Sequence, residues 1–228
     1  MGSRHVPLIA AVLGVFVAAS SAEVIVTNLA EPLRATTDIG NNPNPVKPPP
    51  GVPGWSWAAQ SFTTDATSYS LTKIDMIAGN AAAKPIVIAE LRADDGFGQI
   101  GPVITTLSTP SFDGPLGPKT LLPVTPVTLA PSTIYWVVIG SQAPGDGTFG
   151  LSYANTNNSE GVGIITAYAD SQDSGATWNY GTLNPYFIQV VGERTVKCTG
   201  CTGDADGSGA VNFNDITTVL SSLGATCR

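Results

Sequence analysis

Short runs of alternating apolar and polar residues, separated by turn-forming residues, extend from residue 23 to about residue 192. The run Ser70–Ala78 places Ile74 and Met76 on one face, which is typical of a half-buried strand. The run Ile134–Ile139 is apolar on both faces, as expected for a strand with covered faces. Further strands are predicted at 24–26, 57–64, 85–92, 103–107, 121–129, 149–153 and 186–191. Roughly nine or ten strands at this spacing predict a mainly β fold, either a jelly-roll-like or an Ig-like β-sandwich.

Two turn-rich segments interrupt the predicted strands. Six prolines lie between Asp38 and Gly54, and we expect an extended surface loop there because proline cannot donate a hydrogen bond within a central strand. The sequence Asp94-Asp95-Gly96 predicts a hairpin turn, since Asp and Gly tolerate the backbone angles of tight turns.

The amino-terminal residues 1–22 have the pattern of a signal peptide. Arg4 precedes an apolar run from Val6 to Ala19, and small residues up to Ala22 offer a cleavage site. The apolar run is shorter than the roughly 20 residues that span a bilayer, and no second run of that length follows. We therefore expect an exported protein, secreted or at the cell surface, with no transmembrane segment in the mature chain.

Composition and charge narrow the function classes. The chain has 10 Lys and Arg against 17 Asp and Glu, a net charge of -7, which argues against a nucleic-acid partner. The single histidine, His5, lies in the signal peptide, so the mature chain is expected to lack a Ser-His-Asp or Cys-His site.

The segment 204–215 fits a twelve-residue calcium loop. Side-chain or backbone oxygens stand at positions one, three, five, seven, nine and twelve, and the predicted ligands are Asp204, Asp206, Ser208, Ala210 (through its carbonyl), Asn212 and Asp215. Gly209 at position six permits the sharp turn of such a loop. The sequence therefore predicts a Ca²⁺ site.

A helix is predicted from Phe213 to Leu223, with Ile216, Val219 and Leu220 on one apolar stripe and Gly224 after its end.

The patterns described so far divide the chain into four parts. They are a signal peptide at 1–22, a β-sandwich at 23–192, a linker at 193–200 and an EF-hand-like calcium-binding module at 201–228.

The three cysteines lie at the carboxy-terminal end. In an exported chain they are interpreted as disulfide partners. A bond between Cys201 and Cys227 would close a loop of about 25 residues and contribute roughly 3 kcal/mol, and Cys198–Cys227 is the alternative. Cys198 and Cys201 could also form a redox pair, although the surroundings are not those of a thioredoxin-like unit.

Short landmark segments follow one another along the β-rich part: Gln60–Thr64, Tyr69–Ile74, Ile88–Gly96, Leu129–Ile139, Trp178 and Phe187–Gly192. In these segments the β-rich part resembles the choice-of-anchor R domain of secreted bacterial proteins. The resemblance implies a β-sandwich carried with varied carboxy-terminal anchoring segments, and it brings no catalytic residues.

The segment Gly203–Gly224 resembles one repeat of a type I dockerin, in which a calcium loop runs into a Leu-rich helix. Dockerins usually carry two repeats and this chain has one. The resemblance implies calcium binding at the residues named above and a cohesin-like or cell-envelope protein partner.

These observations predict a non-enzymatic secreted protein with a docking tail. The alternative is a glycan-binding or accessory component of a polysaccharide-degrading complex, in which Trp55 and Trp57 stack on a sugar ring instead of packing in the core. A hydrolase would need two carboxylates across a cleft, and no spacing identifies a pair among Glu90, Asp94, Asp95, Glu160, Asp170 and Asp173.

Overall fold

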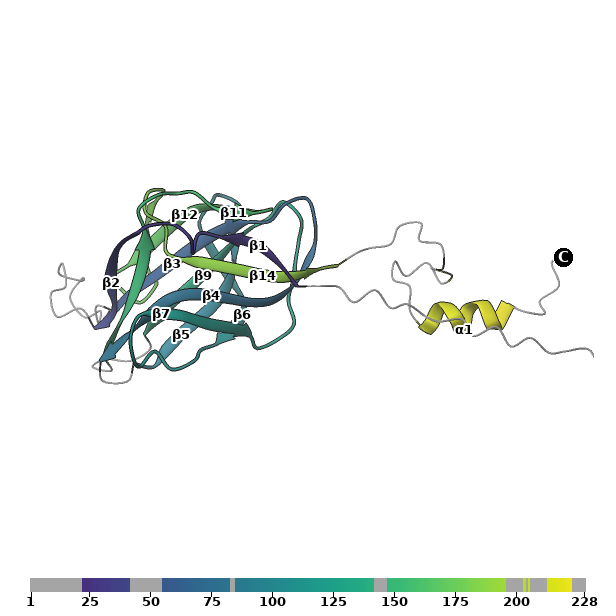
Figure 1. Ribbon diagram of the computed structural model, residues 1–228, viewed down its shortest axis with the longest axis horizontal. Coiled ribbons are helices and arrows are strands. Elements are labelled where there is room, and N and C mark those ends of the chain that lie inside the picture. Colours follow the sequence, from purple (N-terminus) through teal and green to yellow (C-terminus); the bar gives the residue numbers. More distant parts are fainter. Residues whose placement is uncertain are drawn as a thin grey trace, which may run out of the picture.

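The computed structural model describes residues 22–41, 55–82, 85–141, 147–195, 203, 205 and 213–222 (Figure 1). Fourteen strands and one helix lie in these ranges. The strands are β1 (Glu23–Thr27), β2 (Leu33–Asn41), β3 (Trp55–Thr63), β4 (Tyr69–Ala82), β5 (Val87–Asp94), β6 (Ile100–Ser108), β7 (Gly117–Pro123), β8 (Thr128–Leu129), β9 (Ile134–Ser141), β10 (Thr148–Ala154), β11 (Glu160–Gly161), β12 (Ile164–Ser171), β13 (Asn179–Gly181) and β14 (Ile188–Arg194), and the helix is α1 (Phe213–Ser222).

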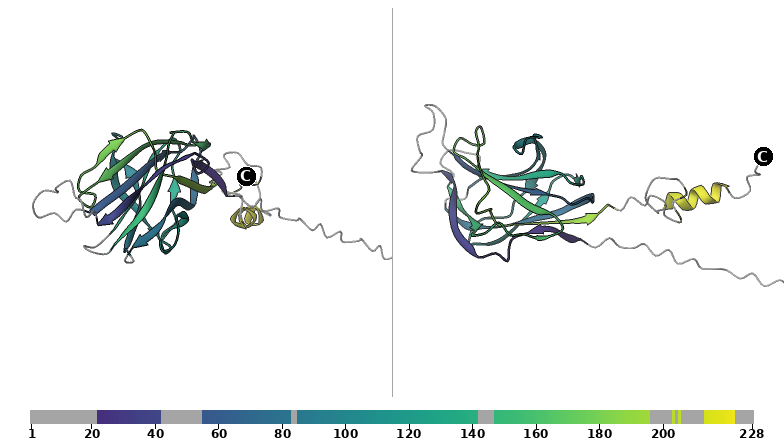
Figure 2. Two further views of the ribbon diagram at one scale, coloured as in Figure 1. Left: turned by 60° about the vertical axis from the view of Figure 1, so that its left-hand side comes forward. Right: turned by 90° about the horizontal axis from the view of Figure 1, so that it is seen from above.

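The strands form one 14-stranded antiparallel sheet. They fall into two groups of consecutively paired strands, which we call the two ladders. In the first, β2, β10, β4, β14, β1 and β11 follow one another, and β7 and β8 also pair with β4. In the second, the order is β13, β12, β3, β9, β5 and β6. The ladders join where β2 pairs with β3 and where β6 pairs with β7. The sheet folds over, so that the ladders face each other across the core (Figure 2).

The main core contains side chains from both ladders, such as Ile74 and Phe149 from one and Phe62 and Leu91 from the other, all fully buried. A second, smaller cluster lies on the other face of β3 and β9 and contains Trp57, Ala59, Trp136, Val138 and Ala169. Strand β9 contributes alternate side chains to both clusters. Its predicted burial on both faces is therefore confirmed.

Most predicted strands are confirmed within a few residues, and the predicted mainly β fold with one carboxy-terminal helix is found. The run 121–129 was expected to be one strand, but it divides into β7 and β8. Pro123 and Pro126 lie at the break, and neither has an N–H group to continue a ladder.

Two long strands, β2 and β12, were not predicted. Residues 38–41, expected to begin the proline-rich loop, are the end of β2 instead. They precede the first proline, Pro43, so Asp38 and Gly40 can still pair with Gly150 and Thr148 of β10. Residues 42–54 of the expected loop lie outside the described residues.

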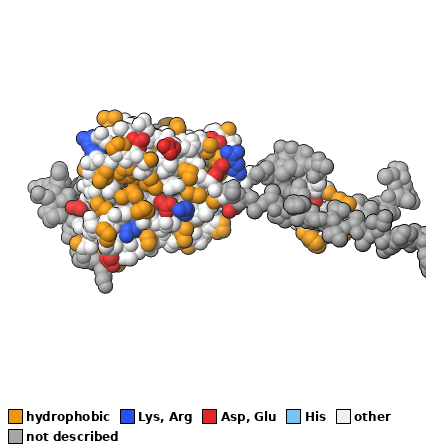
Figure 3. Space-filling model, viewed as in Figure 1, with side chains coloured by type: hydrophobic (Ala, Val, Ile, Leu, Met, Phe, Trp, Pro, Cys, Tyr) orange, Lys and Arg blue, Asp and Glu red, His pale blue; other side chains and the backbone are white. Residues whose placement is uncertain are grey.

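The first and last strands are neighbours. Glu23 pairs with Gly192, and the Nε of Arg194 donates to Glu23 Oε1 at 2.6 Å. The described chain therefore enters and leaves the sheet side by side. On the face drawn in Figure 3, lysine and arginine side chains are scattered singly, and some of them lie beside acidic ones. No helix among the described residues is long and apolar enough to cross a membrane.

Candidate functional site

Most of the predicted calcium loop lies outside the described residues. Of the six predicted ligands only Asp215 is described, while Asp204, Asp206, Ser208, Ala210 and Asn212 are not. Cys201, Cys227 and Cys198 are also outside, so the disulfide stays a prediction. The helix that follows the loop begins at Phe213 as expected.

Asp215 has an environment unusual for an acidic residue on a single helix. Its side chain is only 2% exposed, and its Oδ1 accepts a hydrogen bond of 2.8 Å from the backbone N–H of Ala205. Asp215 is the twelfth residue of the predicted loop and Ala205 the second. The contact therefore brings the start of the loop to the first turn of α1.

Several carboxylates considered for a hydrolase are engaged locally. Asp94 Oδ1 accepts from the N–H groups of Gly96 and Gly98, and Asp95 Oδ1 accepts from those of Phe97 and Gln99. The predicted turn is thus confirmed, with Gly96 at a φ of 92°. These two carboxylates hold the β5–β6 connection together.

Two other candidates are likewise tied to neighbours. Glu90 Oε2 accepts from the Arg92 guanidinium at 2.6 and 2.8 Å. For Asp173, partial burial alone would raise the pKa, but hydrogen bonds from Thr177 and Ser171 outweigh it and hold the pKa below its ordinary value. Both carboxylates therefore have a structural explanation.

Trp57 packs in the core. Its side chain is 8% exposed, and its indole N–H donates to the carbonyl oxygen of Ser141 at 3.0 Å. This burial confirms the packing interpretation of Trp57, rather than the alternative in which it stacks on a sugar ring. The side chain of Trp55 is outside what the structure describes.

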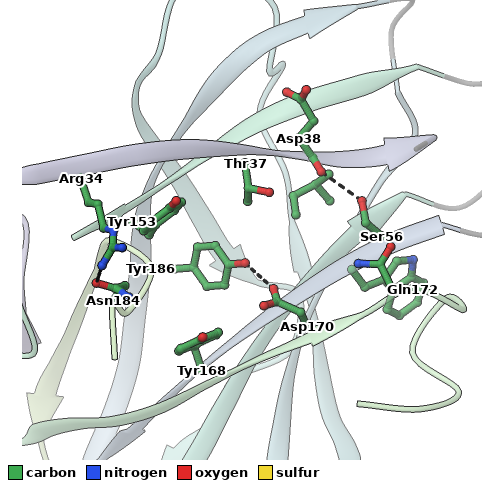
Figure 4. Close-up of a pocket in the computed structure, with 12 residues that line it drawn as sticks. Arg34, Thr37, Asp38, Ser56, Tyr153, Tyr168, Asp170, Gln172, Asn184 and Tyr186 are labelled. Atoms are coloured by element: carbon green, nitrogen blue, oxygen red, sulfur yellow. Dashed lines mark hydrogen bonds between the residues drawn. The ribbon is translucent and has the colours of Figure 1, made fainter. Parts of the chain in front are cut away.

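A pocket forms where two strands share one edge of β3. Strand β2 pairs with the start of β3 through Gly40 and Ser56, and β12 takes over that edge from Trp57 onward. Because β2 then continues along β10, it diverges from β12 and leaves a fork between them. We call this space of about 330 Å³ the fork pocket. It is lined by Arg34, Thr37, Asp38, Ile39, Ser56, Trp57, Tyr153, Tyr168, Asp170, Gln172, Asn184 and Tyr186 (Figure 4).

Three tyrosines form the aromatic part of the fork pocket. Tyr186 is 4% exposed, and its ring is nearly perpendicular to those of Tyr153 and Tyr168, at centroid distances of 6.3 and 6.0 Å. The backbone N–H of Tyr186 donates to Gln60 Oε1 at 2.8 Å, which fixes the segment between β13 and β14 against β3. Tyr186 therefore forms the buried base of the fork pocket, and the half-buried Tyr153 and Tyr168 lie beside it.

Two polar pairs also line the fork pocket. The Tyr186 hydroxyl points to Asp170 and donates to its Oδ1, and the Arg34 guanidinium donates to Asn184 Oδ1 (Figure 4). Burial raises the pKa of the Asp170 carboxyl, although the hydrogen bond from Tyr186 acts in the opposite direction. Burial and the nearby Asp170 charge raise the pKa of Tyr186 well above its ordinary value, so its hydroxyl remains the donor.

Asn184 lies in a turn with a left-handed backbone conformation. Its φ is 62°, in the left-handed region that asparagine tolerates better than most residues other than glycine, and its N–H donates to Asn157 Oδ1 at 3.2 Å. The turn places the Asn184 side chain against Arg34.

Sequence reasoning named Asp170 among six carboxylates but missed the fork pocket. An available signal was the Tyr168-x-Asp170 spacing, because residues two apart on a strand share a face. It could not be used without recognising β12.

The chain matches no protein-family model and no curated protein, so these comparisons identify no family for it.

Proposed function

We propose that the protein is a non-enzymatic β-sandwich, jelly-roll-like or Ig-like, that a calcium-binding tail docks to a protein partner. Its signal-peptide pattern at 1–22 supports a location outside the cell, secreted or at the cell surface. The observation that carries the proposal is the hydrogen bond from Ala205 to the buried carboxylate of Asp215.

The residues of the tail fit Ca²⁺. A calcium loop must fold back so that its first and twelfth positions approach one ion. The contact between the second position, Ala205, and the twelfth, Asp215, supports that closure. The ligands would be the side chains of Asp204, Asp206, Ser208, Asn212 and Asp215 and the carbonyl of Ala210. All of these are oxygen donors, the type that calcium prefers.

Helix α1 supports a docking role. Four of its apolar side chains are 39–73% exposed: Phe213, Ile216, Val219 and Leu220. Contiguous exposed apolar side chains are typical of an interaction surface. The proposed partner is a cohesin-like or cell-envelope protein that covers this stripe.

The surroundings of four of the six candidate carboxylates favour a non-enzymatic sheet domain. Glu90, Asp94, Asp95 and Asp173 each accept hydrogen bonds that hold local structure. A glycosidase needs two carboxylates about 5–10 Å apart across a substrate cleft, and these four are engaged in turns and strands instead.

Calorimetric titration of the mature chain, residues 23–228, with Ca²⁺ tests the proposal. We expect one ion per chain and an increase in helical circular dichroism. Asp204→Ala and Asp215→Ala should abolish both signals because each removes a charged ligand, whereas Ser208→Ala should weaken binding less because water can replace a neutral oxygen.

Asp113→Ala is the matched control, since it removes an exposed aspartate from the sheet domain. Equal binding by Asp204→Ala and the control would contradict the proposed site. Docking is tested separately by retention of the mature chain on cell-envelope material, with calcium and with a chelator. Retention that is unchanged by the chelator, or that persists in a chain without residues 198–228, would contradict the docking role.

A further inference from the structure

The fork pocket has polar groups that are available to a ligand. Asp170 uses Oδ1 to accept from Tyr186, and its Oδ2 has no hydrogen-bond partner within the described ranges. The same holds there for the hydroxyls of Tyr153 and Tyr168. These oxygens stand on two strands, β10 and β12, around one space (Figure 4). A ligand in it could therefore be held from two sides.

The charges around the fork pocket disfavour an anionic ligand and are compatible with a neutral one. One cation, Arg34, and two carboxylates, Asp38 and Asp170, line it. Phosphate or carboxylate ligands would meet the two acidic groups, while an ammonium ligand would meet the guanidinium. A neutral ligand avoids both conflicts.

Hydroxyl groups match this lining. Each hydroxyl is one donor and two acceptors, so neighbouring hydroxyls can donate to a carboxylate and accept from a guanidinium or amide. The tyrosine rings supply apolar surface beside these groups, and aromatic walls with a few fixed polar groups are typical of small-molecule sites. A volume of about 330 Å³ is near the lower end of the range for such sites.

One feature of the fork pocket lowers the stability of the fold. The Asp170 carboxylate is partly buried, and no cation among the described residues is bonded to it. Partly buried charged groups of this kind are more frequent at functional sites than elsewhere. Packing alone would be served better by an uncharged side chain at residue 170.

We propose that the fork pocket binds a neutral carbohydrate ring. Asp170 and Asn184 bond its hydroxyls, Arg34 donates to its oxygens, and Tyr153 and Tyr168 contact its apolar faces. This site differs from the tryptophan stack considered from the sequence, because Trp57 is buried. It does not depend on the calcium tail.

The test is saturation-transfer NMR, followed by calorimetry, on the mature chain with free glucose, xylose, mannose and galactose and with their neutral β-linked tetrasaccharides. Galacturonic acid and its tetramer form the acidic arm. We expect at least one neutral sugar to bind, and comparison of monosaccharide with tetrasaccharide separates a free-sugar site from a glycan site. Binding of the acidic arm alone, or of no sugar, would overturn the proposal.

Two conservative variants locate the site. Asp170→Asn should weaken binding about tenfold or more, since hydrogen bonds to charged groups contribute most, and Tyr168→Phe about threefold. Glu160→Gln and Tyr180→Phe are the matched controls, because both residues are exposed and neither lines the fork pocket. A thermal melt of each variant verifies folding. Unchanged affinity in folded Asp170→Asn and Tyr168→Phe would overturn the assignment to this pocket.

Discussion

The position of Trp57 leads to a sharp prediction about Gly140. A Cβ atom on Gly140 would lie 2.4–2.5 Å from three ring atoms of Trp57, nearer than side chains ever approach. The Trp57 ring cannot move away easily. Gly175 packs against the ring, since a Cβ atom built on Gly175 would lie 3.0–3.2 Å from it, and the indole N–H of Trp57 donates to the carbonyl oxygen of Ser141. Gly140→Ala should therefore destabilise the sheet domain.

The expected size follows from overpacking. Forcing an extra methyl group into a filled core costs about 1–3 kcal/mol. A β-strand otherwise favours alanine over glycine by roughly 0.5–1 kcal/mol, which offsets part of that cost. For a domain of this size each kcal/mol lowers the melting temperature by about 2–4 °C. With that offset included, we expect Gly140→Ala to melt a few degrees, and at most about 10 °C, below the wild type.

Gly117→Ala is the matched control. Gly117 lies in strand β7, and a Cβ there would meet nothing within 4 Å. It should melt at the wild-type temperature or slightly above, because alanine restricts the unfolded chain. Thermal melts followed by circular dichroism at 220 nm are sufficient. Equal melting of both variants would refute the conclusion that Trp57 is fixed over Gly140.

Three further predictions concern pH, domain independence and the cysteines. Because the folded-state pKa of Asp170 is raised, the folded chain holds more protons above the ordinary value of 3.8, and the free energy of unfolding falls as pH rises through that window. Asp170→Asn should remove this loss, so at pH 7 it should melt above the wild type and below pH 3.8 it should not; a variant less stable at pH 7 would contradict the burial argument. The segment 23–195 alone should melt cooperatively and independently of calcium, since the core residues described above all lie within it, and a melt that requires the tail would disprove this. Non-reducing peptide mapping of the exported chain should recover Cys201 linked to Cys227, whereas recovery of Cys198 linked to Cys201 would exclude that pairing.

The strands that could be predicted have strong apolar periodicity. Strand β9 is apolar on both faces because one face meets the main core and the other meets the cluster around Trp136. Strand β2, with the sequence LRATTDIGN, has only Ile39 as a large buried apolar side chain, and Leu33 is 60% exposed. Its pairing with β10 stabilises it, and such long-range pairing leaves no local pattern.

The fork pocket could not be predicted for the same reason. Its tyrosines come from three separate segments and resemble ordinary core aromatics when each is viewed alone. They come together only because the pairing partner along this edge of β3 changes from β2 to β12 at Trp57. Helix α1 could be predicted without knowledge of any strand pairing, because the spacing of its apolar residues is a local pattern.

The pairing of the first strand with the last has a consequence for the order in which the molecule can form. Strand β14 lies between β1 and β4, so β1 lacks this partner until residue 194 has been synthesised. Ribosomes add about 5–20 residues per second, which leaves Ile25 and Val26 without their final burial for roughly 10–30 s. The sheet domain therefore reaches its final strand pairing only after β14 has been synthesised, so we expect its closure late in, or after, translation.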